Sequence, residues 1–356
     1  MRVVVAMSGG VDSSVSALLL REQGHDVIGV FLRNGIEAGA RGKGQGCCGA
    51  TDARDAEEVA AELSVPFYAL DHAGPFTRVI DRFVAAWSRG ETPNPCVDCN
   101  REIKFGALLE LAGRLGADAL ATGHYAQVRV HPDGDVELLR ARDRAKDQSY
   151  VLATVARPAL ARAIFPLATL QKDEVRELAR TKGLPVHAKP ESQEICFVPT
   201  GDYRDLLRER RPELFRAGIV RGVDGRELGH HDGAVGFTVG QRKGLRVAAG
   251  EPRYVVRTDV ARNEVVVGDA AAARRTNATL RDVNELAPPE LHADGGAVEL
   301  QVRAHHAPLA ATLCSSLADG RRRLALAPPG EVITPGQVAV AYRGDRVLLA
   351  GTLCAD

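Results

Sequence analysis

The chain has 356 residues, and its 46 basic side chains balance 46 acidic ones. That length allows two or three domains, and the zero net charge lacks the basic excess typical of nucleic-acid-binding proteins, although a local basic patch could still hold RNA. No apolar run approaches the roughly 18 residues of a membrane span, and the first residues lack the pattern of a secretory signal, so we expect a cytoplasmic protein.

The first 200 residues alternate short β-branched runs with helical patterns. We predict strands at Arg2–Met7, Val27–Leu32, Phe67–Leu70 and Ala119–Thr122. Helices are predicted at Ser13–Gln23, Asp52–Ser64, Phe76–Trp87, Ile103–Leu115 and Thr169–Lys182. This alternation is typical of an α/β domain with a doubly wound parallel sheet, helices on both faces and a ligand at the carboxyl ends of the strands.

Beyond residue 200 the pattern changes to turn-rich sequence and short valine-rich runs. A basic helix is predicted at Arg204–Arg216, whose arginines either contact phosphate or lie on a solvated face. Strands predicted at Glu264–Val267, Ala297–Val302, Gln337–Ala341 and Arg346–Leu349 are typical of a β-barrel or sandwich. We expect three domains: a catalytic domain over residues 1–200, a small central adaptor over 201–268 and a C-terminal β-barrel over 269–356.

The strongest chemical signal is the segment Ser8–Ser13, SGGVDS, between the first predicted strand and helix. Its glycines let backbone N–H groups approach a phosphate, and the helix N-terminus adds partial positive charge. It resembles the pyrophosphatase loop of enzymes that cleave ATP between the α and β phosphates, where Asp12 would hold Mg²⁺ or orient the pyrophosphate. The alternative is a glycine turn capped by serine.

A second signal is the cysteine-containing stretch Thr92–Asn100, TPNPCVDCN. We expect a helix to begin just after Cys99, with Asn100 as its cap. A cysteine at a helix N-terminus near Arg101 and Lys104 has a lowered pKa and is a good nucleophile. The alternative is a buried, inert thiol.

Five motifs together carry a family resemblance. They are Ser8–Ser13, Thr92–Phe105, Thr122–Ala126, Lys146–Tyr150 and Ile195–Phe197, the last containing Cys196. Two further segments, Thr238–Leu245 and Pro335–Gln337, fit the same family. The chain is therefore similar over nearly its whole length to the tRNA 2-thiouridylase family, which belongs to the pyrophosphatase-loop superfamily.

The resemblance implies ATP-dependent 2-thiolation of the wobble uridine of tRNA, the first base of the anticodon, flipped out of its stack. ATP adenylates the uridine O2, releasing pyrophosphate, and sulfur then displaces AMP from C2. It also implies that Cys196 carries a persulfide and that Cys99 attacks it as the nucleophile. That attack would leave a transient Cys99–Cys196 disulfide, as expected in a reducing compartment.

One position departs from the commonest family pattern, because Cys96 stands where many members have aspartate. Cys96, Cys99 and Cys196 could instead hold an iron–sulfur cluster with one open iron. A structural zinc site with Cys47 or Cys48 as the fourth ligand is a further alternative. The persulfide relay is favoured, and no metal is assigned. Cys314 and Cys354 are expected to be core residues of the β domain.

The resemblance implies two sets of binding residues, although Leu32 could instead be an ordinary core residue at a strand end and His124 a local structural donor. The ATP-binding set is Ala6, Met7, Ser8, Gly9, Gly10, Val11, Asp12, Ser13, Leu32 and Gly123. The tRNA-contacting set is His124, Lys146, Asp147, Gln148 and Gln337. The implied partners are the anticodon arms of tRNAs for lysine, glutamate and glutamine, and a cysteine desulfurase or relay protein that donates the persulfide.

Two rival functions remain open at this point. A small-molecule adenylating ligase would share the SGGVDS loop but would not need the paired cysteines. A non-catalytic tRNA- or metal-binding protein would not cleave ATP at all. Release of pyrophosphate that depends on tRNA separates both rivals from a thiouridylase.

Overall fold

The computed structural model describes residues 1–35, 49–191, 195–198, 201–245, 247, 251–304 and 306–355. The possible zinc ligands Cys47 and Cys48 lie outside these residues. The chain forms two units: the first comprises Met1–Ile80, Pro95–Gly201 and Asp345–Val347, and the second comprises Asp81–Asn94, Asp202–Gly344 and Leu348–Asp356. The expected division into three domains stays a prediction.

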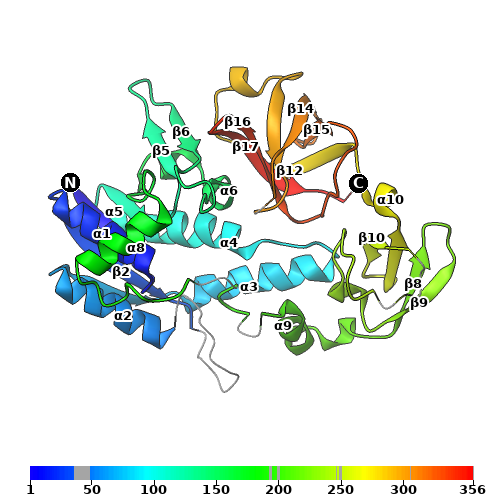
Figure 1. The fold of residues 1–356 in the computed structure, drawn as a ribbon, viewed down its shortest axis with the longest axis horizontal. Coiled ribbons are helices and arrows are strands. Elements are labelled where there is room, and N and C mark those ends of the chain that lie inside the picture. The colour runs from blue at the N-terminus through cyan, green and yellow to red at the C-terminus, as the bar shows by residue number, and fades with distance from the viewer. Residues whose placement is uncertain are drawn as a thin grey trace. The chain divides into compact units, whose positions relative to one another are not determined.

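The first unit is built on a five-stranded parallel sheet (Figure 1). Its strands, in spatial order, are β3 (Phe67–Asp71), β2 (Asp26–Arg33), β1 (Arg2–Ala6), β4 (Ala119–Thr122) and β7 (Ala163–Ile164). The strand order runs outward from β1 on one side and from β4 on the other. The predicted doubly wound sheet is confirmed, and its switch point, where such folds bind ligands, lies between β1 and β4.

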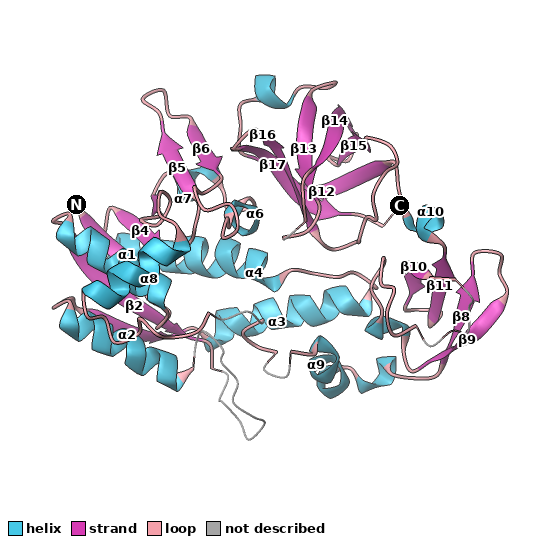
Figure 2. Ribbon diagram, in the orientation of Figure 1, coloured by secondary structure: helices cyan, strands magenta, loops and turns pink. Residues whose placement is uncertain are grey.

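Helices cover this sheet, and α1 and α8 lie side by side (Figure 2). The longer ones are α1 (Val11–Glu22), α2 (Ala50–Glu62), α3 (Ala73–Ser88) and α8 (Lys172–Thr181). Shorter elements are α6 (Ser149–Leu152), α7 (Arg157–Leu160) and the hairpin β5 (Gln127–Val130) and β6 (Val136–Leu139). Val5 of β1, Val15 of α1 and Val175 of α8 are fully buried in one core, so these elements hold one another in place.

The helix that carries the cysteines begins earlier than expected. It starts with α4 (Pro95–Asp98), continues as a π-helical segment, Cys99–Leu108, and ends with α5 (Leu109–Arg114). The predicted start after Cys99 is wrong because proline at a first helical position starts a helix rather than blocking one. Asn100 is not a cap, since its Nδ2 donates to the carbonyl of Val151 at 3.1 Å.

The second unit contains a four-stranded sheet and a barrel. The sheet has the order β10 (Tyr254–Asp259), β11 (Glu264–Gly268), β8 (Gly218–Gly222) and β9 (Glu227–His231). Helices of this unit are α9 (Tyr203–Arg210), α10 (Ala270–Ala273) and three 3₁₀ turns, Pro212–Leu214, Ala234–Gly236 and Pro289–His292. The predicted basic helix therefore ends at Arg210 rather than Arg216, because Pro212 cannot continue it.

The C-terminal strands close into a six-stranded barrel, which confirms the expected C-terminal β-barrel. Their order is β12 (Asn277–Glu285), β15 (Arg322–Leu326), β14 (Leu309–Ser316), β13 (Ala297–Gln301), β16 (Val338–Arg343) and β17 (Arg346–Leu353), and β12 pairs with β17. No helix within the described ranges is long and apolar enough to cross a membrane.

Cys314 and Cys354 are half-buried, so the expectation that they are core residues is wrong. Cys314 lies within β14, and Cys354 lies directly after the end of β17. The side chain of Leu313 enters the barrel core, so strand alternation directs the next residue, Cys314, away from it.

Candidate active site

The loop between β1 and α1 has the backbone of a phosphate-binding turn. Gly9 has φ +71° and lies against α2, where a Cβ would come within 2.2 Å of the Asp52 carbonyl oxygen. The hydroxyls of Ser13 and Ser14 donate to the carbonyl of Gly10 at 3.1 and 2.9 Å. The loop is thus held by its own side chains, and the first N–H groups of α1 remain available for an anion.

Gly123 joins this loop from the end of β4. A Cβ on Gly123 would lie 2.7 Å from the Ser13 nitrogen and 2.8 Å from the Asp12 carbonyl carbon, so only glycine allows this close approach. Leu32 lies near the carboxyl end of β2 and is half-buried. The segment Ala6–Ser13 and Gly123 are therefore brought together at the switch point of the sheet, and their contact with ATP stays a prediction.

Two lysines that the sequence analysis did not single out hold the loop from either side. Lys172, the first residue of α8, donates to both carboxylate oxygens of Asp12 at 2.7 and 2.8 Å. Lys189 donates to the Gly9 carbonyl at 2.9 Å, to Asp52 at 2.7 Å and to Asp55. Burial lowers the pKa of Lys189, but the two carboxylates outweigh it and the net pKa is raised.

Two further groups complete the surroundings of Asp12. The Tyr125 hydroxyl donates to Asp12 Oδ1 at 2.8 Å, and burial together with the Asp12 charge raises the pKa of Tyr125 far above its usual range. Glu191 accepts from Lys146 at 2.7 Å and lies 3.3 Å from Lys172. The hydrogen bond from Lys146 outweighs the effect of burial and lowers the pKa of Glu191.

His124 is buried inside the first unit. Its Nδ1 lies 2.6 Å from the Thr122 hydroxyl and its Nε2 lies 3.4 Å from Lys104 Nζ. Because an ammonium only donates, Nε2 is the acceptor and the neutral ring carries its proton on Nδ1. Burial, and secondarily the Lys104 charge, holds the pKa of His124 well below 6.5. Its expected contact with tRNA stays a prediction.

We expect this histidine to make the protein less stable in acid. Below pH 6.5 the unfolded chain binds a proton at His124 that the folded chain excludes. The free energy of unfolding should therefore fall by up to about 1.4 kcal/mol per pH unit until the folded-state pKa is reached. The free energy of unfolding in urea, measured at several pH values from roughly 7.5 down to roughly 5.5, tests this expectation, because a free histidine titrates within that range.

The variant to compare is His124→Gln, in which that slope should shrink even if overall stability drops. His230, whose side chain is 72% exposed, supplies the control His230→Gln, which should keep the parent's slope. An unchanged slope in His124→Gln would refute the assignment.

Asp147 and Gln148 are engaged within the first unit. The Asp147 carboxylate accepts from the Ala141 nitrogen at 2.8 Å and from the Ser149 hydroxyl at 2.7 Å, and burial raises its pKa. Gln148 accepts through Oε1 from the Tyr125 nitrogen at 3.0 Å. Asp147 thus ties together residues 141–149 and Gln148 joins this segment to Tyr125, and their contact with tRNA stays a prediction.

The three candidate cysteines all belong to the first unit. Cys96 is exposed, whereas Cys99 and Cys196 are half-buried. Cys96 and Cys99 are three residues apart on one helix, so they share a face. The Arg101 guanidinium pairs with Asp98 at 2.7 Å and Glu102 at 3.0 Å, so its charge is balanced locally.

The segment with Cys196 is anchored through its neighbour. The ring of Phe197 packs edge-on against Phe76 of α3 with centroids 5.9 Å apart. The catalytic roles of Cys99 and Cys196 stay predictions.

Gln337 lies in the second unit, at the barrel. Its Nε2 donates to the Thr92 carbonyl at 2.8 Å, and the Thr92 nitrogen donates to the Pro335 carbonyl at 2.7 Å. Gln337 and Thr92 line a cavity of about 270 Å³ together with Gln241 and Arg303. The side chain of Gln337 is thus engaged within the second unit, and its expected contact with tRNA stays a prediction.

The arginines around α9 have acidic partners. Arg204 lies 3.5 Å from Asp202, Arg208 lies 3.1 Å from Asp205, Arg210 lies 3.7 Å from Asp81, and Arg211 pairs with Glu213. This pairing favours the solvated-face interpretation over a phosphate-binding strip.

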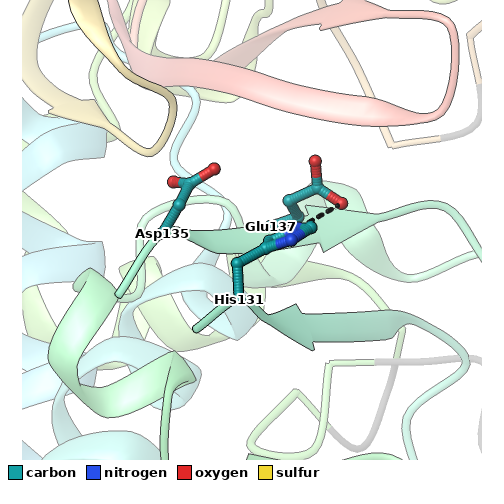
Figure 3. Close-up of side chains that lie close together, drawn as sticks. All are labelled: His131, Asp135 and Glu137. Atoms are coloured by element: carbon teal, nitrogen blue, oxygen red, sulfur yellow. Dashed lines mark ion pairs between the residues drawn. The ribbon is translucent and has the colours of Figure 1, made fainter. Parts of the chain in front are cut away.

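The hairpin β5–β6 brings together His131, Asp135 and Glu137, whose potential ligand atoms lie within 4.8 Å of one another (Figure 3). His131 lies 3.3 Å from Glu137. Arg346 pairs with both carboxylates, at 2.6 Å to Asp135 and 2.8 Å to Glu137. Arg157 lies 3.2 Å from Asp135 and Arg129 lies 3.3 Å from Glu137. Because these arginines and Arg346 balance the two carboxylates, the cluster is better described as an ion-pair network than as a metal centre.

Comparisons with known proteins cover almost the whole chain. Residues 1–200 match the family described as tRNA methyl transferase HUP domain, 204–269 the tRNA methyl transferase PRC-barrel domain, and 276–353 the aminomethyltransferase beta-barrel domain. The chain is 49% identical over 354 residues to the tRNA-specific 2-thiouridylase MnmA of Chloroflexus aurantiacus, covering 98% of this chain and 97% of the relative.

A second relative with the same description comes from Methylobacterium nodulans. It is 47% identical over 358 residues, covering 99% of this chain and 94% of the relative. Identity of this extent along both chains, with the ATP-type loop at the sheet switch point, leads to one conclusion: the chain belongs to the tRNA-specific 2-thiouridylase family.

Proposed function

We propose that this protein replaces O2 of the first anticodon uridine of tRNA with sulfur, at the cost of one ATP cleaved to AMP and pyrophosphate. The observation that carries this proposal is the full-length similarity to 2-thiouridylases, joined to a phosphate-type loop and three cysteines in one unit. The proposed location is the cytoplasm, where transient disulfides are reduced again.

The loop at the N-terminus of α1 supports the first half-reaction. Its N–H groups and helix dipole suit the phosphates of ATP, and the glycines leave room for them. The uridine O2 attacks the α-phosphorus, the α–β P–O bond breaks, and pyrophosphate leaves. O2 is then part of a good leaving group, AMP, instead of a poor one.

Mg²⁺ is expected to enter with the nucleotide, bound to its phosphates and to water. Asp12 was expected either to hold Mg²⁺ or to orient the pyrophosphate, but both oxygens of its carboxylate accept from Lys172. Asp52 and Asp55 are likewise paired with Lys189. This arrangement fits a protein-held metal ion poorly, so no step here is assigned to one.

The second half-reaction moves sulfur. A donor persulfide passes its outer sulfur to the Cys196 thiolate, leaving a donor thiol and a Cys196 persulfide. The Cys99 thiolate attacks the Cys196 sulfur, the S–S bond of the persulfide breaks, and hydrosulfide departs as the Cys99–Cys196 disulfide forms. Hydrosulfide adds to C2 and AMP leaves. A dithiol reductant of the cytosol then restores both thiols.

The proposed partners follow from this chemistry. The RNA substrates are tRNAs for lysine, glutamate and glutamine, engaged through the anticodon arm. The sulfur donor is a cysteine desulfurase or a protein that relays its persulfide.

The relay and an iron–sulfur cluster differ in what Cys96 does. In the relay Cys96 is a bystander, so Cys96→Asp should keep most thiolation activity in air. In a cluster it is an iron ligand, and Cys96→Ala should lose both iron and activity. We expect the relay. Near-stoichiometric iron in the anaerobically purified parent, with iron and thiolation both gone in Cys96→Ala, would overturn it.

The direct test of the reaction class is pyrophosphate release. We expect release from ATP only when tRNA is present, because the uridine oxygen is the nucleophile. Release driven equally well by a small carboxylic acid without tRNA would favour a ligase. Tight tRNA binding without any release would favour a binding protein.

A further inference from the structure

Lys172 is a buried cation in a place that disfavours positive charge. It is the first residue of α8, where the helix dipole opposes a cation, and it is only 8% exposed. Burying an ammonium costs free energy unless anions compensate it. The groups around its Nζ therefore explain why a lysine stands here.

Two carboxylates surround the Lys172 ammonium. Both oxygens of Asp12 accept from it, at 2.7 and 2.8 Å, and Glu191 Oε1 lies farther away, at 3.3 Å. The ring of Tyr125 lies 5.7 Å from Nζ. An ammonium has three donors, so two go to Asp12 and the third goes to Glu191 at the longest distance.

Glu191 does not depend on that third donor. Lys146 donates to it at 2.7 Å and Arg176 lies 3.6 Å away. Lys172 could turn away from Glu191 without leaving that carboxylate uncompensated.

Asp12 lies in the first turn of α1, next to the loop where the proposed function puts the triphosphate. A carboxylate and a polyphosphate repel each other at this range unless a cation lies between them. We propose that Lys172 binds the pyrophosphate part of ATP, keeping Asp12 and exchanging Glu191 for a phosphate oxygen. The proposal rests on the proposed function and adds a residue that touches the leaving group.

The chemical consequence concerns the breaking bond. As the α–β P–O bond breaks, negative charge grows on the departing pyrophosphate, and an ammonium already fixed by Asp12 stabilises it without reorganising. Asp12 then acts as the positioning residue for Lys172. In this role, Asp12 of the SGGVDS loop does not bind a metal ion.

The simpler role for Lys172 is that of a counter-ion to Asp12 alone. A double-mutant cycle separates the two roles. We would measure binding of ATP, AMP and inorganic pyrophosphate by calorimetry without tRNA, for Lys172→Met, Asp12→Asn and the double variant. The double variant leaves no uncompensated charge, and thermal unfolding checks that each protein is folded. Lys182→Met removes the exposed partner of Glu22 just past the same helix and serves as the control.

Lys172→Met should weaken ATP and pyrophosphate binding about tenfold or more, the loss expected for a hydrogen bond between charged groups. AMP binding should stay unchanged, and the double variant should bind ATP as weakly as Lys172→Met. Lys182→Met should match the parent protein with all three ligands.

Recovery of ATP binding in the double variant would show that Lys172 only neutralises Asp12, and would overturn the proposal. An equal loss of AMP binding would overturn it too, because it would mean a disturbed loop. If the parent thiolates tRNA but Lys172→Met binds ATP normally, only this inference fails. If the parent binds no ATP, the proposed function fails with it.

Discussion

Cys99→Ser and Cys196→Ser are each expected to form no 2-thiouridine, although both should still release pyrophosphate in the presence of tRNA. The sulfur transfer needs one sulfur to carry the persulfide and a second to attack it, and a serine hydroxyl does neither at neutral pH. Adenylation uses the loop at α1 and no thiol, so it should survive. Nucleoside mass spectrometry of the tRNA, run beside a pyrophosphate assay, measures both half-reactions.

The matched controls are Cys314→Ser and Cys354→Ser. Both residues are half-buried and belong to the barrel of the second unit, so their variants should thiolate like the parent. Substantial 2-thiouridine from Cys196→Ser would rule out the relay as assigned. Loss of pyrophosphate release in both catalytic variants would instead tie the thiols to adenylation.

Gly123→Ala should bind ATP at least about tenfold more weakly than the parent protein. Its new Cβ would come within 3 Å of the Ser13 nitrogen and the Asp12 carbonyl carbon, which belong to the loop backbone. Relieving that overlap must move either β4 or the start of α1, at a cost of about 1–3 kcal/mol. ATP affinity measured by calorimetry and thermal unfolding would record the two effects.

Gly74→Ala is the control for this change. An added Cβ there meets no atom within 4 Å, so both ATP affinity and stability should be retained. Normal ATP binding by Gly123→Ala would show that the phosphates do not lie against this part of the loop.

The strands and the loop of the first unit could be predicted from the sequence because each is encoded within one short segment. Strand β4 spans Ala119–Thr122, as predicted, and the SGGVDS loop lies between β1 and α1. The cysteine helix was expected to begin just after Cys99, but it begins at Pro95, because proline favours the first position of a helix.

The two lysines that contact the loop, Lys172 and Lys189, could not be predicted from local sequence patterns. Lys172 and Asp12 are 160 residues apart, and nothing in the pattern around Lys172 distinguishes it from other charged residues of an amphipathic helix. Only the packing of α8 beside α1 brings the ammonium to the loop. Likewise, the acidic partners of Arg208 and Arg210 favour a solvated face, and Asp81 is far from Arg210 in sequence.

The proposed reaction changes a single base of the tRNA, so analysis of that base can show whether it occurs. The protein would be incubated with ATP, a persulfide donor and unmodified lysine tRNA, and with the same tRNA carrying cytidine at the first anticodon position. Digestion and mass spectrometry would then locate any sulfur. We predict 2-thiouridine at that position of the uridine-containing tRNA and none in the cytidine variant. ATP-dependent sulfur at another base, or equal labelling of both tRNAs, would contradict the account.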